Sequence, residues 1–295
     1  MILIDFNQTL ISNLMSQINA SPTSELSEDM IRHMVLSTIL SYKKKFSDEY
    51  GELIFCTDDR TYWRKDVFPY YKANRKKMRD ASKYDWNLIF TTLNKIRDEI
   101  KEFFPYTVIQ VDGAEADDII GTMVRYSQKN NLSSGTLDPQ PEKVLILSGD
   151  KDFVQLQKYN NVRQYSPMFK KYITCDDPKK TLKEHILTGD SGDGIPNVLS
   201  QDSVFVTEGT RQKPLRKDKI KSWIELENLD SIEDENILRN YKRNQQLIDL
   251  DFTPINIQEK IIKCYETGPQ GQKRHLLNYF VKNRLKYLLE SISEF

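Results

Sequence analysis

Short β-prone apolar runs alternate with longer amphipathic stretches over the first half of the chain. The runs rich in Val, Ile, Leu and Phe lie at 2–6, 53–57, 107–111, 144–147 and 162–165. Between them, apolar residues recur every three or four positions, as on one face of a helix, at 30–39, 93–103 and 116–126. This alternation predicts an α/β fold with a mostly parallel central sheet flanked by helices.

The pattern changes at three places along the chain. Residues 60–83 turn basic, with aromatic side chains between the cations, and form an insert in the α/β pattern. Residues 130–142 are rich in Ser, Gly, Pro and Asn and predict a surface loop. After about residue 176 the strand pattern ends. We therefore expect an α/β domain at 1–177 and a smaller helical domain at 178–295.

The composition sets limits on the class of protein. The 295 residues include 43 Lys and Arg against 43 Asp and Glu, so the formal net charge is zero. This balance excludes a polybasic tail protein but allows acidic and basic segments along the chain. No apolar run approaches the roughly 20 residues of a membrane span, and the first residues lack the pattern of a signal peptide. The three cysteines are far apart, so we expect a reduced intracellular protein without membrane contact.

Acidic residues follow the apolar runs at four places. They are Asp5, Asp58, the group Glu115, Asp117 and Asp118, and the pair Asp150 and Asp152. Because the carboxyl ends of parallel strands meet at one edge of a sheet, we expect these side chains to converge. Clustered carboxylates repel one another unless a cation neutralises them. Mg²⁺ takes oxygen ligands of this kind, and two such ions about 4 Å apart are the usual apparatus for phosphodiester hydrolysis.

Other interpretations of these acids stay open. Each acid alone is explained by capping of the helix that follows its strand. The Asp150-Lys151-Asp152 motif is also typical of haloacid-dehalogenase-type phosphatases, although there it opens the chain, and here three acidic strand ends precede it. The sequence has no P-loop and no nucleophile elbow. Its three histidines, His33, His185 and His275, are not clustered in sequence.

Several motifs occur in order along the chain. They are Ile4-Asp5-Phe6, Tyr62-Trp63-Arg64, Tyr71-Lys72-Ala73-Asn74-Arg75, Glu115-Ala116-Asp117-Asp118, Gly149-Asp150-Lys151-Asp152-Phe153 and Gly189-Asp190-Ser191-Gly192-Asp193-Gly194-Ile195-Pro196-Asn197. In this order and spacing they resemble the flap endonuclease, or structure-specific 5′-nuclease, family, and within it the ribonucleases H of T-even bacteriophages. The resemblance runs to the C-terminal Ser-Ile-Ser-Glu-Phe and covers nearly the whole chain.

The resemblance implies a Mg²⁺-dependent 5′→3′ nuclease with two metal ions, for which Mn²⁺ can substitute. It assigns the first ion to Asp5, Asp58, Glu115, Asp117 and Asp150. It assigns the second to Asp150, Asp152, Asp190 and Asp193, with Asp118 next to the cluster. Such an enzyme degrades the RNA of RNA–DNA hybrids and DNA duplexes from their 5′ ends and cuts 5′ flaps. In phage replication it removes RNA primers from lagging-strand fragments.

Residues 60–83 resemble the helical arch of that family. Lys72 and Arg75 are three positions apart, so on a helix both would face the scissile phosphate and act in catalysis. Arg64 and Arg79 would grip neighbouring phosphates, and Tyr71 would stack on the 5′-terminal base. The alternative is a solvated basic helix. A basic clamp opposite an acidic metal site also explains the net charge of zero.

Residues 189–197 resemble the start of the family's helix–three-turn–helix, in which glycines bring backbone N–H groups to the phosphates of a duplex. Gly189, Gly192 and Gly194 would do so here, and the alternative is a Gly-rich loop between helices. The sequence departs from the cellular pattern at Gly194 and Asn197, so binding of the family's potassium ion at this turn stays open. A basic loop offers further phosphate contacts from Lys213, Arg216 and Lys217.

The expected substrates are branched or nicked duplex DNA and RNA–DNA hybrids, bound by a monomer in the host cytoplasm. Residues 279–295 either pack on their own domain or meet a single-strand-binding protein. The chain starts inside its first strand, without the leading tail of the T-even relatives, so no sliding-clamp contact is expected. Two rival functions stay open, a catalytically inactive structure-specific DNA-binding protein and a PIN-type endoribonuclease.

Overall fold

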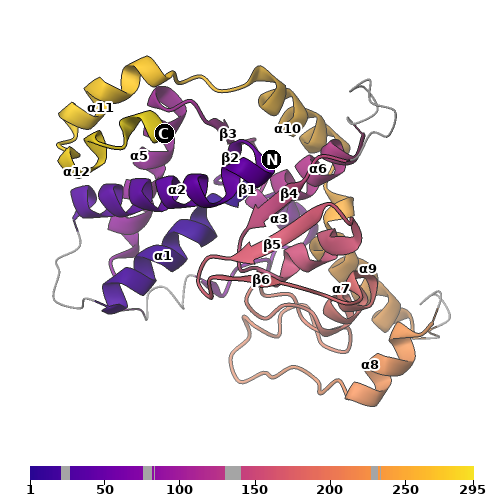
Figure 1. Ribbon diagram of the computed structural model, residues 1–295. Helices are drawn as coiled ribbons and strands as arrows, with labels where there is room; N and C mark the ends of the chain where they lie inside the picture. Colours follow the sequence, from indigo (N-terminus) through magenta and orange to yellow (C-terminus); the bar gives the residue numbers. More distant parts are fainter. Residues whose placement is uncertain (21–26, 76–81, 83, 130–140, 227–231, 233) are drawn as a thin grey trace, which may run out of the picture.

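A six-stranded sheet forms the centre of the computed structural model, which describes residues 1–20, 27–75, 82, 84–129, 141–226, 232 and 234–295. The strands are β1 (Ile2–Asp5), β2 (Leu53–Cys56), β3 (Thr107–Ile109), β4 (Val144–Leu147), β5 (Val162–Ser166) and β6 (Lys171–Ile173). Their order is β3-β2-β1-β4-β5-β6, and every neighbouring pair is parallel except β5 and β6 (Figure 1). The predicted α/β fold with a mostly parallel sheet is confirmed.

The edge strand β6 was missed by the sequence pattern. Lys171 and Tyr172 are exposed and only Ile173 is partly buried, so this segment has no apolar run to mark it. The five predicted runs, by contrast, lie in strands whose side chains are mostly buried, because helices cover both faces of the sheet.

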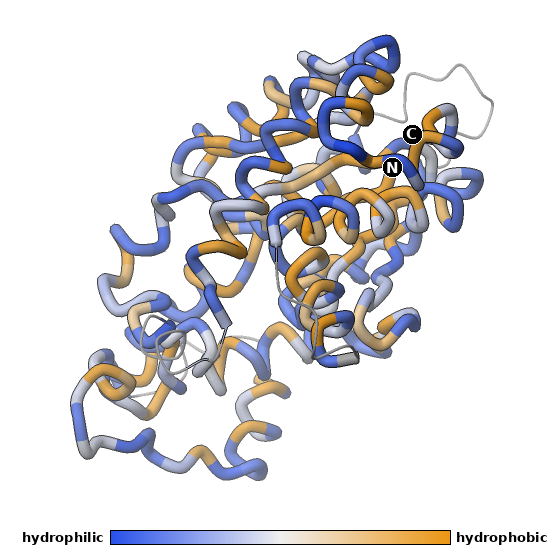
Figure 2. Tube along the Cα trace, turned by 90° about the vertical axis from the view of Figure 1, so that its left-hand side faces the viewer, coloured by the Kyte–Doolittle hydropathy of each residue, from blue (hydrophilic) through white to orange (hydrophobic). Residues whose placement is uncertain are grey.

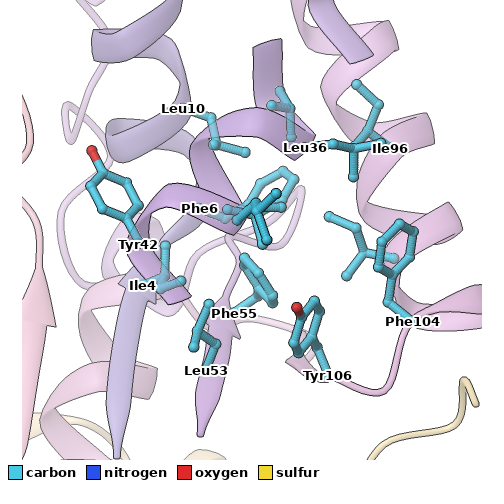
Figure 3. Close-up of a cluster of buried hydrophobic side chains, with 14 of the residues drawn as sticks. Ile4, Phe6, Leu10, Leu36, Tyr42, Leu53, Phe55, Ile96, Phe104 and Tyr106 are labelled. Atoms are coloured by element: carbon cyan, nitrogen blue, oxygen red, sulfur yellow. The ribbon is translucent and has the colours of Figure 1, made fainter. Parts of the chain in front are cut away.

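Alternate residues of each strand enter two separate cores. Ile2 and Ile4 of β1 pack on one face of the sheet and Leu3 packs on the other. The first face is covered by α1 (Phe6–Ala20), α2 (Glu28–Tyr50) and α5 (Trp86–Phe103). Figure 3 shows side chains from these helices, including Leu10 and Leu36, above Ile4 and Phe55 of the sheet.

The second face of the sheet is covered by α6 (Ala116–Lys129), the 3-10 helix η2 (Lys151–Lys158) and α10 (Ile255–Thr267). The tube view shows apolar segments running through the interior between polar segments at the outside (Figure 2). This arrangement leaves the carboxyl edge of the sheet to the loops, and the acidic residues lie in or next to those loops.

The named elements from residue 178 onward are all helices, as predicted. They include α7 (Pro178–Thr188), α8 (Lys217–Ile224) and α9 (Glu235–Ile248), which lie together at one end of the molecule (Figure 1). A small core around Leu187, Val198 and Trp223 holds these helices together. Among the described residues, no helix combines the length and apolar character needed to cross a bilayer.

The last 20 residues, Leu276–Phe295, return to the first core. Here α11 (Leu276–Lys282) and α12 (Lys286–Leu289) lie beside α5 (Figure 1). Phe280 and Phe295 are fully buried, with ring centroids 6.0 and 5.6 Å from the ring of Phe104. The C-terminal stretch therefore packs on the sheet-containing unit, and the expectation that it packs on its own domain, with α7, α8 and α9, is wrong. The domain boundary at residue 177 stays a prediction.

Candidate active site

A cavity of about 820 Å³ opens at the carboxyl edge of the sheet. Five carboxylates line it, and four of them come from four different segments: Asp5, Asp58, Asp117 and Asp150; the fifth, Asp59, follows Asp58 directly. They follow or end β1, β2 and β4 or begin α6, so the order β2-β1-β4 in the sheet brings them together. The convergence that the strand pattern predicts is therefore present for these four side chains.

Three of these carboxylates also cap helices. Asp5 accepts a hydrogen bond from the backbone N–H of Gln8 at 3.1 Å, and Asp58 accepts one from Ala116 at 2.8 Å. Asp150 accepts one from the backbone N–H of Asp152, in the first turn of η2. Capping and lining of the cavity are thus compatible, because each cap uses one oxygen and fixes the direction of the other.

The electrostatics of the cavity fit a cation. Burial, followed by the charge of Asp58, raises the pKa of Asp5 to about 8. Burial, followed by the charge of Asp150, also raises the pKa of Asp117 well above its usual range. Carboxylates that hold protons at neutral pH for these reasons would exchange them for a divalent ion with oxygen ligands. The donor set therefore fits a hard divalent cation.

A second group of possible ligands consists of Asp152, His185 and Asp190. One ligand atom from each lies within 4.8 Å of the others, which is close enough for one metal ion. Burial, followed by the charge of Asp150, raises the pKa of Asp152 to about 7. His185 was missed because 33 positions separate it from Asp152 in sequence. Its position five residues before Asp190, on a helix leading into the Gly-rich turn, is the one signal that could have found it.

Asp193 does not join this second group. Its carboxylate contacts the guanidinium of Arg75, lies 3.7 Å from Nζ of Lys72 and accepts a 3.1 Å hydrogen bond from the hydroxyl of Tyr71. Glu115 likewise lies away from the lining of the cavity, since Lys72, Tyr71 and Arg64 bind it. Both acids therefore anchor the basic segment in this structure, and their metal contacts stay predictions.

Lys72 and Arg75 both line the cavity, yet they do not share a helix. Lys72 lies in a turn, with a φ of 57°, and its backbone N–H donates to the carbonyl of Asp193 at 2.7 Å. The helical geometry expected for this pair is therefore wrong at Lys72. Arg79 lies outside the described residues, so its phosphate contact stays a prediction.

The expected nucleic-acid contacts of Arg64 and Tyr71 are not available in this structure. Arg64 is 1% exposed, and its guanidinium donates at 2.9 Å to both Glu115 and Asp118. Tyr71 is 2% exposed, so its ring cannot stack on a base without leaving the core. Asp118 is fully buried and accepts hydrogen bonds from Trp63 as well as Arg64. In this structure Arg64, Tyr71 and Asp118 are buried and hold the insert in place, and their roles toward substrate stay predictions.

The Gly-rich turn is closed by its own hydrogen bonds. Asp190 and Ile195 form an antiparallel bridge, and the N–H of Gly192 donates to the Asp190 carboxylate at 2.7 Å. The N–H groups of Gly189 and Gly194 donate to the carbonyls of His185 and Ser191. Each of these three N–H groups therefore already has a partner in this structure, and the expected phosphate contacts stay a prediction.

The basic loop beyond this turn is open to solvent. Lys213, Arg216 and Lys217 are all exposed, and they precede or begin α8. Cations in this position can meet the phosphates of a duplex, and their contribution to affinity would fall as salt rises. Their role in duplex binding stays a prediction.

Comparison with known families identifies the chain. Residues 2–186 match the family model described as the 5′-3′ exonuclease N-terminal resolvase-like domain, and residues 178–295 match the C-terminal domain of T4 RNase H. The chain belongs to the 5′-3′ exonuclease family. The resemblance drawn from the motifs is confirmed, and with it the expectation of a hydrolase that acts as a 5′ nuclease.

Known proteins match the sequence or the fold of this 5′ nuclease over different fractions of the chain. The ribonuclease H of Enterobacteria phage T4 is 34% identical over 99% of this chain and 95% of its own length. The flap endonuclease Xni of Shewanella woodyi is 27% identical over 63% of this chain and 69% of its own length. The phage T5 5′-exonuclease, solved with zinc bound, shares the fold, with a TM-score of 0.62, 18% identity and coverage of 90% of this chain and 97% of its own.

Replacing Asp5 by Asn should raise the Tm of the metal-free nuclease at pH 8. The pKa of Asp5 rises from 3.8 to about 8 on folding, so its favourable contribution is present below about pH 4 and is lost as the pH rises through 8. Asparagine carries no charge, so the variant avoids this loss, and each kcal/mol recovered should appear as about 2–4 °C. Thermal unfolding in EDTA from pH 5 to 8.5 measures the difference.

The control for this experiment is Asp48→Asn, which alters an exposed carboxylate on α2 and should leave the Tm unchanged. Added Mg²⁺ should raise the Tm of the natural protein more than that of Asp5→Asn, because ion binding is linked to folding. A variant that is less stable than the natural protein at pH 8 would contradict the expected repulsion.

Replacing Arg64 by Met should lower the free energy of unfolding of this nuclease by about 3–5 kcal/mol. Methionine fills part of the volume, but it leaves the buried carboxylates of Glu115 and Asp118 without their shared cation. It also removes the 2.8 Å hydrogen bond to the Leu247 carbonyl, which ties α3 (Trp63–Val67) to the end of α9. Urea unfolding measures the loss.

Lys65→Met on the same helix is the matched control, because Lys65 is exposed and should change stability by less than about 0.5 kcal/mol. A loss below about 1 kcal/mol for Arg64→Met would show that the buried network does not stabilise the fold.

Proposed function

We propose that this chain is a Mg²⁺-dependent 5′→3′ nuclease that degrades the RNA of RNA–DNA hybrids and DNA duplexes from 5′ ends and cuts 5′ flaps. One observation supports this above the others. Asp5, Asp58, Asp117 and Asp150 line a single cavity together with Lys72 and Arg75, so an acidic cation site and a basic phosphate site share one space. A phosphodiester with divalent ions bound to its oxygens would complement both charges.

Two ions are proposed at this site. Asp5, Asp58, Asp117 and Asp150 would hold the first, and Asp152 and Asp190 would hold the second. Such ions supply an acidic water for attack on phosphorus and charge to stabilise the leaving oxygen. The chain itself orients the phosphate with Lys72 and Arg75, whose charges oppose the charge that develops on its oxygens.

Residues outside the cavity support a binding mode in which the 5′ end of the substrate lies at the cavity and the adjoining duplex is bound elsewhere on the protein. The exposed cations Lys213, Arg216 and Lys217 would contact duplex phosphates at a distance from the cavity. We propose that the enzyme acts as a monomer in an infected host cell and clears RNA primers from lagging-strand fragments. A contact with a single-strand-binding protein stays a prediction.

The proposal is tested with RNA–DNA hybrid and 5′-flap substrates that carry a label at the 5′ end. We expect release of short labelled products in Mg²⁺ and none in EDTA. A matched substrate that carries its flap at the 3′ end instead of the 5′ end should be cut at the flap much more slowly. Binding without Mg²⁺-dependent release would support the inactive DNA-binding alternative, and cleavage within single-stranded RNA alone would support the PIN-type alternative.

A further inference from the structure

We propose that His185 is a nitrogen ligand of the second ion, which gives that site a preference for Mn²⁺ and similar ions over Mg²⁺. The inference rests on the proposed function, since the second site shares Asp152 and Asp190 with it. It goes further because the resemblance and the proposed function assign only carboxylates to that site. The result is a centre with one all-oxygen site and one site of mixed nitrogen and oxygen donors.

The imidazole of His185 lies between the two acids. Nδ1 is 3.3 Å from Oδ1 of Asp152, and Nε2 is 3.4 Å from Oδ2 of Asp190. The histidine side chain is 11% exposed and the two carboxylates 15% and 16%, so all three are shielded from solvent. An imidazole gives one ion only one of its two nitrogens. One ligand atom each from Asp152, His185 and Asp190 lies within 4.8 Å of the others, which is a separation that ligands of one ion can adopt.

Two buried atoms in this group lack hydrogen-bond partners. They are Oδ1 of Asp152 and Nε2 of His185, judged against the part of the chain that the structure describes. Buried polar atoms normally have partners, so an unpartnered acceptor and an unpartnered ring nitrogen in one cluster point to a missing ligand. A divalent ion would satisfy both atoms at once.

The groups around His185 are compatible with its role as a metal ligand. Lys151 lies 3.1 Å from Oδ2 of Asp190, so that carboxylate already has one cation beside it. Asp152 has the imidazole of His185 beside it, while Asp150 adds a like charge that raises the pKa of Asp152. The backbone carbonyl of His185 accepts the N–H of Gly189, which fixes the end of α7 and thereby the direction of the imidazole.

A nitrogen donor changes which ion the site prefers. Mg²⁺ prefers oxygen ligands and gives up its waters reluctantly, whereas imidazole suits first-row transition ions and zinc. The second site should therefore bind Mn²⁺ more tightly than Mg²⁺, while the described lining of the cavity with Asp5, Asp58, Asp117 and Asp150 contains no histidine. The simplest alternative is a protonated His185 that bridges Asp152 and Asp190 and binds no metal.

Pulsed electron paramagnetic resonance of the full chain loaded with Mn²⁺ distinguishes these two roles. A bound imidazole couples the ¹⁴N nucleus to the ion, and a salt-bridged imidazolium does not bind it. We expect ¹⁴N coupling in the natural protein and its loss in His185→Gln. The double variant His33→Gln/His275→Gln keeps His185 as the sole histidine of the three in the chain, and it should retain the coupling.

Isothermal titration calorimetry measures the affinity of the protein for each ion. His185→Gln should weaken Mn²⁺ binding at one site by at least about tenfold and change Mg²⁺ binding much less. If two Mn²⁺ ions bind to the natural protein without ¹⁴N coupling, the inference is wrong and the two-ion proposal stands. If no Mn²⁺ binds at all, the proposed metal centre itself is wrong. The spectrum of the natural protein decides between these outcomes even if His185→Gln fails to fold.

Discussion

Replacing Asp150 by Asn should reduce Mg²⁺-dependent cleavage of a 5′ flap by at least about 10³-fold while the protein stays folded and binds its substrate. Asp150 lines the cavity, and its charge acts on Asp5, Asp117 and Asp152, so it lies where the two proposed ions would meet. Loss of several kcal/mol of charge stabilisation in the transition state corresponds to a rate loss of this size.

The Asp150→Asn substitution should leave the fold intact. One oxygen of Asp150 accepts the backbone N–H of Asp152 at 3.0 Å, and the amide oxygen of Asn can do the same. Single-turnover cleavage at saturating enzyme measures the rate, and anisotropy with labelled flap DNA in Ca²⁺ measures binding. Asp112→Asn is the matched control, since Asp112 follows β3 but is exposed and lies outside the cavity. Cleavage by Asp150→Asn within tenfold of the natural rate would overturn the assignment.

The meeting of four of the lining carboxylates could be predicted from the sequence because it depends on strand order and direction alone. Asp5 ends β1, and Asp58 and Asp150 follow β2 and β4, which pair with β1 on either side. Parallel strands place such positions at one edge whatever their exact register. The apolar runs that predict the strands therefore also locate the cavity.

The fate of Glu115 could not be predicted in this way. It lies in the same motif as Asp117, but its carboxylate binds Arg64, Tyr71 and Lys72, which approach from the insert. The sequence shows that Arg64 is basic, but it does not show that its side chain is buried. From the sequence alone, a buried ion pair with Glu115 therefore cannot be distinguished from a contact with a substrate phosphate. Burial decides between them, and burial depends on packing between distant segments.

The packing of the C-terminal residues could not be predicted from the sequence for the same reason. The spacing of apolar residues indicates helices near the end of the chain, but it does not say what those helices cover. Phe280 and Phe295 fill a space beside Phe104, and Gly271 allows the chain to reach it, because a Cβ there would lie 2.2 Å from the Phe104 carbonyl oxygen. Contacts between residues this far apart in sequence follow from shape, which a single sequence does not display.

Replacing Lys72 by Ala should slow the chemical step by about 10²–10³-fold and weaken substrate binding by less than about threefold. Lys72 lines the cavity beside the lining carboxylates, and its ammonium is held by Glu115 and Asp193. A fixed cation at the phosphate stabilises charge that develops during cleavage, and loss of one such group has an effect of this size. Binding depends on many phosphate contacts, so it changes little when one is removed.

The two effects are separated by measuring the single-turnover rate at saturating enzyme and the Kd for the same flap in Ca²⁺. The fold should survive, because Glu115 keeps its contacts with Arg64 and Tyr71 when Lys72 is removed. Lys213→Ala is the opposite control. It removes an exposed cation at a distance from the cavity and should weaken binding in a salt-dependent way without slowing the saturated rate. If Lys72→Ala lowers rate and affinity equally, Lys72 contributes only to substrate binding, and the charge that assists the chemical step must come from Arg75 or from the metal ions.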